Sequence, residues 1–140
     1  MSVYFDTSVI VPLFAVDAFV ARARAFLATY PTDVFVSEFA VAEFASVIGM
    51  RCRMKALTLE EGHKVLVNFD TWRARKTLTA ETLPSDIRAA EAILRRLDLN
   101  LRTPDAIHIA TTQRLGAALA TFDARMAESA EALGVKTVVM

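Results

Sequence analysis

The chain has 140 residues, a formal net charge of zero from 16 basic and 16 acidic residues, and a hydrophobic share of 54%. This length predicts one domain over residues 1–140, and the balanced charge excludes proteins that bind nucleic acid through net positive charge alone. The sequence contains no apolar run of membrane-spanning length and no basic leader, and Cys52 has no cysteine to pair with. We therefore expect a cytoplasmic protein outside the membrane, with apolar surface available for a partner.

Short apolar runs alternate with helical patterns along the chain. The predicted strands cover residues 3–5, 34–36, 77–79, 117–122 and 135–139. The predicted helices cover residues 7–14, 18–30, 37–55, 58–75, 84–97, 103–115 and 123–133. Short apolar strands separated by helices favour a parallel sheet with helices on both faces, so the pattern predicts an α/β sandwich.

Several helix starts carry residues that commonly cap helices. The predicted N-caps are Asp17, Ser37, Thr58, Thr103 and Asp123. Thr58 and Glu61 form a capping-box pattern, and Gly116 and Gly134 are the predicted helix stops.

Acidic residues follow two of the predicted strands. Asp6 ends the strand over residues 3–5, and Asp123 follows the strand over residues 117–122. The carboxyl ends of parallel strands lie at one edge of a sheet, where ligands bind, so we expect the two acids to meet there. Asp105 begins a helix and can join them if the connector over residues 99–102 brings it to the same edge.

Glu43 differs from the other acids because it lies inside an apolar helical segment. The sequence has no Lys or Arg three or four residues away that could pair with Glu43 on its own helix. An unpaired buried carboxylate costs several kcal/mol, so Glu43 needs a cation or a place at a cleft. Clustered carboxylates are typical of Mg²⁺ sites, and such an ion can activate water and stabilise charge on a phosphodiester. The four acids together predict a metal-dependent nuclease site.

Each candidate also has a structural explanation. Asp6, Asp105 and Asp123 can each cap a helix, and Glu43 can reach solvent from the rim of its helix. His108 follows Asp105 by one helical turn and can approach the site, although a core or rim position is the more common role. His63 is expected on the surface.

The sequence resembles PIN-domain ribonucleases at its acidic motifs. These motifs are Phe5-Asp6-Thr7-Ser8, the lone Glu43, Thr103-Pro104-Asp105-Ala106-Ile107-His108-Ile109-Ala110 and Thr121-Phe122-Asp123. Their arrangement over a short chain, from residue 2 to 139, is similar to that of VapC-type toxins of toxin–antitoxin pairs. The resemblance implies a three-layer α/β/α sandwich with a five-stranded, mainly parallel sheet.

The resemblance also implies a function and a site. Asp6, Glu43, Asp105 and Asp123 would form the catalytic site of an endoribonuclease and bind Mg²⁺ or Mn²⁺. Thr7 and Thr121 would contact the substrate or the waters on the metal. The implied partners are an RNA substrate, a cognate antitoxin and a second copy in a homodimer. The antitoxin tail is expected in a groove formed by the helices over residues 18–30 and 58–75.

Three alternatives remain at this point. The chain could be a non-catalytic PIN-like module that binds metal or a basic partner tail, or a PIN nuclease with a housekeeping role in RNA processing. A receiver domain or a haloacid-dehalogenase-like phosphatase is a third possibility. The phosphatase requires a second Asp two positions after Asp6, where the chain has Ser8, and both classes require a late Lys near a strand end.

Overall fold

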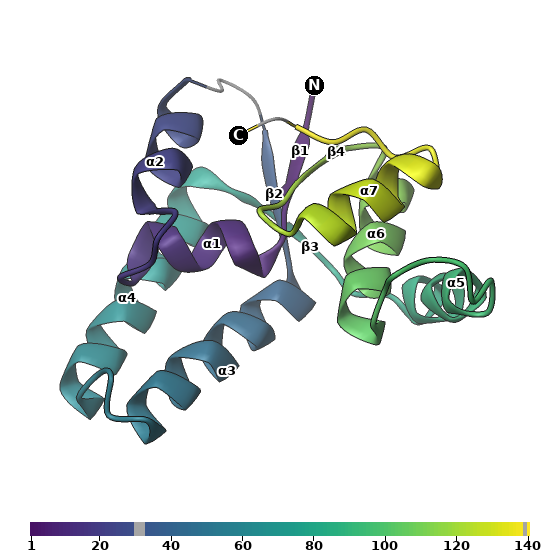
Figure 1. Cartoon of the computed structure of the whole chain (residues 1–140). Helices are drawn as coiled ribbons and strands as arrows, with labels where there is room; N and C mark the ends of the chain where they lie inside the picture. Colours follow the sequence, from purple (N-terminus) through teal and green to yellow (C-terminus); the bar gives the residue numbers. More distant parts are fainter. Residues whose placement is uncertain (30–32, 139) are drawn as a thin grey trace.

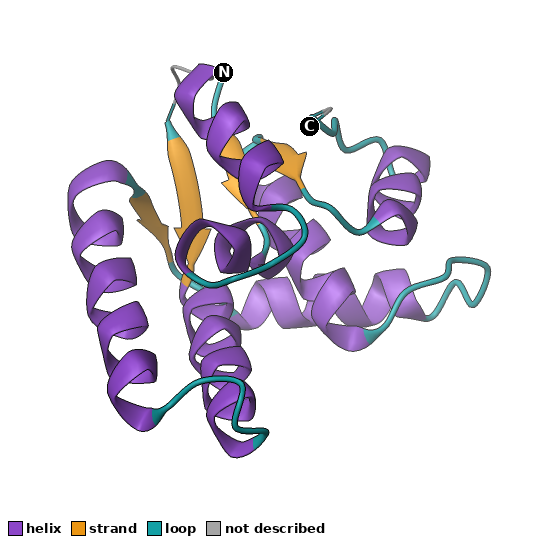
Figure 2. Cartoon of the chain, turned by 60° about the vertical axis from the view of Figure 1, so that its left-hand side comes forward, coloured by secondary structure: helices purple, strands orange, loops and turns teal. Residues whose placement is uncertain are grey.

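The computed structural model describes residues 1–29, 33–138 and 140. In this part of the chain, two helices follow each of the first three strands and one helix follows the last (Figures 1 and 2). The strands are β1 (Val3–Phe5), β2 (Val34–Ser37), β3 (Leu78–Ala80) and β4 (Ala118–Ala120). The helices are α1 (Thr7–Phe14), α2 (Val20–Thr29), α3 (Glu38–Arg53), α4 (Leu59–Lys76), α5 (Pro84–Leu94), α6 (Thr103–Leu115) and α7 (Ala124–Ala132).

The strands form one parallel sheet in the order β3-β2-β1-β4. The prediction of a fifth strand over residues 135–139 is wrong, because the sheet of the described residues has four strands. The segment after α7 does run beside β4, but it pairs with it only through an isolated bridge between Leu119 and Thr137. Two backbone hydrogen bonds of Leu119, to Lys136 and from Val138, hold this segment in place. Residue 139 lies outside the described residues.

Helices cover both faces of the sheet, which confirms the predicted three-layer sandwich. Side chains alternate between the faces along β1: Val3 and Phe5 belong to one buried cluster, and Tyr4 belongs to the other. The first cluster includes residues of α1, α3 and α4, and the second includes residues of α5, α6 and α7. In Figure 1 the helices of the first cluster lie toward the left of the sheet, and those of the second cluster lie on its right.

Side-chain caps fix most helix starts as the sequence predicts. Ser37 accepts a hydrogen bond from the Ala40 N–H, and Thr58 and Glu61 form the predicted capping box. Two caps are wrong. Asp17 accepts a hydrogen bond from the Phe19 N–H in a turn, so α2 begins only at Val20.

The second wrong cap is at α6, where Thr103 is the first helical residue. Asp105 replaces the expected hydroxyl cap because its carboxylate accepts a hydrogen bond from the Arg102 N–H. At the other end of α6, Gly116 adopts the left-handed conformation, with a φ of 62°, and ends the helix as predicted. The predicted end of the second helix, at Tyr30 and Pro31, lies outside the described residues.

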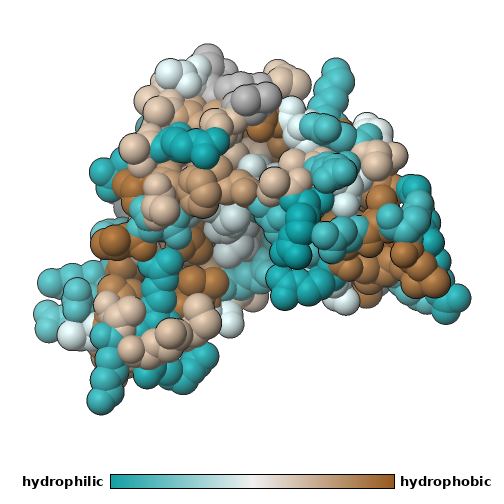
Figure 3. Space-filling view, in the orientation of Figure 1, coloured by the Kyte–Doolittle hydropathy of each residue, from teal (hydrophilic) through white to brown (hydrophobic). Residues whose placement is uncertain are grey.

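Apolar side chains remain exposed around α3 and α4. They are Met50, Met54, Leu59 and Val67. Figure 3 shows apolar atoms at the surface of the lobe that these helices build. Across the described residues, no helix combines the length and the apolar character that crossing a membrane requires.

Candidate active site at the carboxyl edge of the sheet

Asp6 is a buried carboxylate at the carboxyl end of β1, with 2% of its surface exposed. Its side chain caps α1, since Oδ1 accepts hydrogen bonds from the Ser8 hydroxyl at 2.7 Å and from the Val9 N–H at 3.3 Å. Oδ2 accepts a hydrogen bond from the Thr121 hydroxyl at 2.5 Å. Burial raises the pKa of Asp6 above its ordinary value, and these hydrogen bonds oppose the rise without cancelling it. No ion pair in the described part of the chain involves Asp6.

Thr121 connects Asp6 to Asp123. Its hydroxyl donates to Asp6 and accepts a hydrogen bond from the Asp123 N–H at 3.0 Å. Asp123 caps α7, because its Oδ1 accepts hydrogen bonds from the N–H groups of Arg125 and Met126. Asp6 and Asp123 therefore each cap a helix, as their structural explanation expected. They also lie at the same edge of the sheet, on either side of the Thr121 hydroxyl.

Glu43 reaches the same edge from the second turn of α3. Its Oε1 accepts a hydrogen bond from the Thr7 hydroxyl at 2.7 Å and contacts His108 Nε2 at 2.5 Å. Burial raises the pKa of Glu43, but the hydrogen bonds from His108 and Thr7 outweigh it, so the pKa lies below its ordinary value. Thr7 directly follows Asp6, and its contact links the two acids.

Asp105 remains apart from this network. Its Oδ2 caps α6 through the Arg102 N–H at 2.9 Å, and it shares no hydrogen bond with the other three acids. Its side chain is not among those that line the cleft described below. In the structure, then, Asp105 has the role of a helix cap.

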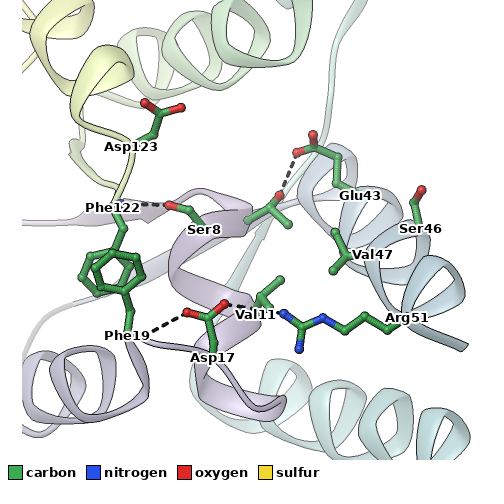
Figure 4. Close-up of a pocket in the computed structure, with 11 residues that line it drawn as sticks. Ser8, Val11, Asp17, Phe19, Glu43, Ser46, Val47, Arg51, Phe122 and Asp123 are labelled. Carbon is green, nitrogen blue, oxygen red and sulfur yellow. Dashed lines mark hydrogen bonds and ion pairs between the residues drawn. The ribbon is translucent and has the colours of Figure 1, made fainter. Parts of the chain in front are cut away.

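A cleft of about 520 Å³ opens beside Glu43 and Asp123 (Figure 4). Thr7, Ser8, Glu43 and Asp123 line one part of it, and Val11 and Val47 provide apolar walls. Phe19 and Phe122 stack at another edge, with ring centroids 4.5 Å apart. Arg51 also lines the cleft, where it pairs with Asp17 at 3.5 Å and donates to the Val16 carbonyl.

The acids supply the oxygen ligands that Mg²⁺ and Mn²⁺ accept, which is the chemical part of the fit. In Glu43, Asp105 and Asp123 one carboxylate oxygen is engaged, and the other receives no hydrogen bond from any described residue. Within residues 1–29, 33–138 and 140, however, no three His, Cys, Asp or Glu side chains are grouped closely enough to hold a metal ion as they stand. The donor set therefore fits a hard cation, and its closure around one requires side-chain movement.

The sequence did not reveal two features of this site. His108 is buried, as its structural explanation expected, and it also reaches the site, as its position one turn after Asp105 allowed. Its contact with Glu43 was not predicted. The aromatic edge and the Asp17–Arg51 pair had no signal, because Phe19, Phe122 and Arg51 come from three separate segments that only the fold brings together.

Comparison with known proteins identifies the family of this arrangement. Residues 3–132 match the PIN domain family. The chain belongs to the PIN domain family. No curated protein sequence matched it.

Solved structures with this PIN fold cover nearly the whole chain. Mycobacterium tuberculosis VapC20, described as a sarcin–ricin loop cleaving toxin, aligns with a TM-score of 0.77 and 22% identity over 99% of both chains. FitAcB from Neisseria gonorrhoeae aligns with a TM-score of 0.67 and 18% identity over 98% of this chain and 96% of that one. A toxin–antitoxin complex from Klebsiella pneumoniae aligns with a TM-score of 0.59 and 20% identity, over 85% and 84%. At these identities the likeness establishes the shared fold.

Proposed function

We propose that this PIN domain is a metal-dependent endoribonuclease and the toxin of a toxin–antitoxin pair. The observation that carries the proposal is Asp6, a buried carboxylate that pairs with no cationic side chain of the described residues. It lies at the carboxyl edge of the sheet, next to a cleft lined by Glu43 and Asp123. The PIN family of the chain, and the likeness of the chain to a toxin described as cleaving the sarcin–ricin loop, support RNA as the substrate.

The proposed metal ligands are Asp6, Glu43, Asp105 and Asp123, and the ion is Mg²⁺ or Mn²⁺. Bound there, the ion would activate a water and offset the negative charge that develops on the phosphodiester. It would also neutralise the buried charge of Asp6, which no side chain does among the described ion pairs. Asp105 would join the other three acids from its position as the cap of α6.

The other polar residues of the site have supporting roles in this proposal. Ser8 and Thr121 hold the two oxygens of Asp6, and Thr7 holds Oε1 of Glu43. These bonds fix the Asp6 and Glu43 carboxylates before an ion or a substrate arrives, which lowers the cost of ordering them on binding. The side-chain movement that closes the site would then fall on Asp105 and Asp123. The apolar walls and Arg51 give the cleft surfaces suited to a nucleobase and a phosphate.

The decisive experiment is RNA cleavage by the purified protein with Mg²⁺, with Mn²⁺ and with EDTA. We expect cleavage by the unsubstituted protein with metal only. Asp6→Asn should abolish it, and the matched control Asp70→Asn, at an exposed position on α4, should leave it unchanged. Equal cleavage by Asp6→Asn and the unsubstituted protein would contradict the proposed site.

The cleavage assay distinguishes the proposed nuclease from a non-catalytic module, and a growth experiment distinguishes a toxin from a housekeeping nuclease. A non-catalytic module would bind Mn²⁺ and leave every RNA intact. A housekeeping nuclease would cleave RNA but would not arrest growth when expressed without a partner. The proposal therefore predicts growth arrest by the unsubstituted protein and normal growth with Asp6→Asn.

The proposed protein partners are a cognate antitoxin and a second copy of the chain, with all of them in the cytoplasm. The predicted groove between α2 and α4 stays a prediction. A described apolar groove of about 460 Å³ lies instead between α3 and α4, bordered by Ile48, Leu59 and Leu66. The Klebsiella neighbour is described as a toxin–antitoxin complex, which supports an antitoxin as the occupant of such a groove. Co-purification of the product of an adjacent small reading frame tests the antitoxin, and sedimentation of the free chain tests the homodimer.

A further inference from the structure

Four buried or half-buried side chains form a continuous hydrogen-bond chain that ends at Glu43. Ser37 Oγ lies 2.7 Å from the Tyr4 hydroxyl, which lies 2.6 Å from His108 Nδ1. His108 Nε2 then contacts Glu43 Oε1 at 2.5 Å. Ser37, Tyr4 and His108 are all buried, so water does not compete for these bonds.

This chain closes a loop through three elements of the fold. Ser37 is the N-cap of α3, Tyr4 lies in β1, and His108 lies in α6. Glu43 returns the chain to α3, the helix that Ser37 caps. The orientation of the Glu43 side chain is thus tied to the relative positions of a strand and two helices.

Hydrogen-bond accounting assigns the protons along the chain. Ser37 Oγ already accepts a hydrogen bond from the Ala40 N–H, so its own proton is directed to the Tyr4 oxygen. The Tyr4 hydroxyl then donates to His108 Nδ1, which must accept and so carries no proton. The remaining ring proton lies on Nε2 and is donated to Glu43. With a proton on Nδ1 the chain would run in reverse, and the buried Ser37 proton would have no acceptor among the hydrogen bonds of the described residues.

The effect on Glu43 follows from which oxygen is used. His108 and Thr7 both donate to Oε1, and Oε2 receives no hydrogen bond from a described residue. Glu43 lines the cleft, and the Thr7 hydroxyl binds its carboxylate through one oxygen. The carboxylate is therefore held in one orientation that leaves a defined oxygen available.

We propose that His108 is a positioning residue, fixed as the Nε2–H tautomer by Tyr4 and Ser37, that holds Glu43 by Oε1 so that Oε2 is presented to the metal. The proposal rests on the proposed function in one respect, that Glu43 is a metal ligand. The tautomer and its contact with Glu43 are properties of the metal-free protein. They can be measured whether or not the protein binds metal or cleaves RNA.

The first test is ¹⁵N NMR of histidine-labelled, metal-free protein in EDTA. We expect His108 to show a protonated Nε2 and an unprotonated Nδ1, with the Nε2 signal shifting in Glu43→Gln. Tyr4→Phe keeps the ring and removes only the hydroxyl, so we expect it to lose the single tautomer. An unprotonated Nε2, or an unchanged His108 spectrum in Tyr4→Phe, overturns the proposal.

The second test is Mn²⁺ affinity measured by electron paramagnetic resonance. Tyr4 is separated from Glu43 by one residue, His108, in the hydrogen-bond chain. We expect Tyr4→Phe to weaken Mn²⁺ binding by about tenfold, the lower end of the affinity losses typical for groups that orient metal ligands. His108→Gln can still donate one hydrogen bond, so it should retain more affinity than His108→Ala. The control His63→Gln makes the same change at an exposed residue and should bind Mn²⁺ normally.

These outcomes separate positioning from a purely structural role. Thermal unfolding identifies any variant that is merely destabilised, and a folded Tyr4→Phe with unchanged Mn²⁺ affinity overturns the positioning role. An unsubstituted protein that binds no Mn²⁺ overturns the proposed function and the metal-presenting part of this proposal. In that case the NMR result alone decides how His108 holds Glu43.

Discussion

Asp6 and Asp86 are both carboxylates with 2% of their surface exposed, and both lie at a helix start. Asp86 is neutralised by Arg114, whose guanidinium donates to its two oxygens at 2.7 and 3.0 Å. In the part of the chain that the structure describes, Asp6 receives hydrogen bonds only from two hydroxyls and one backbone N–H. Burial raises the pKa of each group, but the Arg114 hydrogen bond and the Leu83 N–H outweigh it at Asp86, whose pKa is lowered, whereas the pKa of Asp6 stays raised.

The difference indicates what each acid does. Asp86 joins α5 to α6 through an internal ion pair, so it is complete within the protein. Asp6 is also held by hydrogen bonds, but no described side chain neutralises it, and in the proposed function a metal ion would offset its charge. The same substitution, Asp→Asn, should therefore have opposite consequences at the two positions.

The largest expected effect is on catalysis at Asp6. Asp6→Asn should reduce RNA cleavage by about a hundredfold or more, since it removes a charge that the proposed metal-dependent reaction requires. The free energy of unfolding in EDTA should stay equal or rise, because the amide removes an uncompensated buried charge. Cleavage assays and urea unfolding of the same preparation measure both, and a destabilised variant would contradict the account.

Asp86→Asn should affect stability instead. Losing a charge-assisted pair with Arg114 should lower the free energy of unfolding by about 2 kcal/mol. The folded fraction should cleave RNA at the normal rate, as titration of intact active sites can establish. A cleavage defect in fully folded Asp86→Asn would place Asp86 in the functional site and remove the contrast.

Asp105→Asn sharpens the boundary of the site. If Asp105 binds the metal, Asp105→Asn should reduce the rate of RNA cleavage by about tenfold or more. If it only caps α6, the variant should lose no more than about 1 kcal/mol of stability and cleave RNA normally. Cleavage and urea unfolding, measured together, decide whether the proposed site has four acids or three.

The smallest effect is a pH dependence of opposite sign at the two buried acids. Asp86 has a lowered folded pKa, so its stabilisation is present above its ordinary value of 3.8 and is lost as the pH falls. Asp6 has a raised folded pKa, so ionised Asp6 destabilises the fold, and this cost disappears as the pH falls toward 3.8. Both the stability gain of Asp6→Asn and the deficit of Asp86→Asn should be largest at neutral pH and shrink in acid. Urea unfolding in EDTA across this range tests the two signs.

Much of the fold could be predicted from local signals. The apolar runs located β1 and β4, and Ser37 and Thr58 marked two helix starts at the residues where the structure has them. Local signals failed where a backbone group was satisfied by an unexpected partner. At α6 the cap is the Asp105 carboxylate and not the Thr103 hydroxyl. The segment near Thr137 pairs with β4 through one isolated bridge and is therefore not a strand.

The site could be predicted only in part. The sequence identified Asp6 and Asp123 at one edge because the ends of parallel strands meet there. It identified Glu43 because no neighbouring cation was available on its helix. The contact between His108 and Glu43 could not be predicted, since it depends on how α6 packs against α3, 65 residues apart in the chain. The Arg114 partner of Asp86 was hidden for the same reason.

The central claim of the proposed function is that Asp6 lacks, among the described residues, the cationic partner that Asp86 has, and that a divalent metal would take this place. Titration of Mn²⁺, followed by electron paramagnetic resonance, into the unsubstituted protein, Asp6→Asn and Asp86→Asn tests this most directly. We predict tight binding to the unsubstituted protein and to Asp86→Asn, and binding weakened by about a hundredfold in Asp6→Asn. Equal Mn²⁺ affinity for all three proteins would contradict the claim.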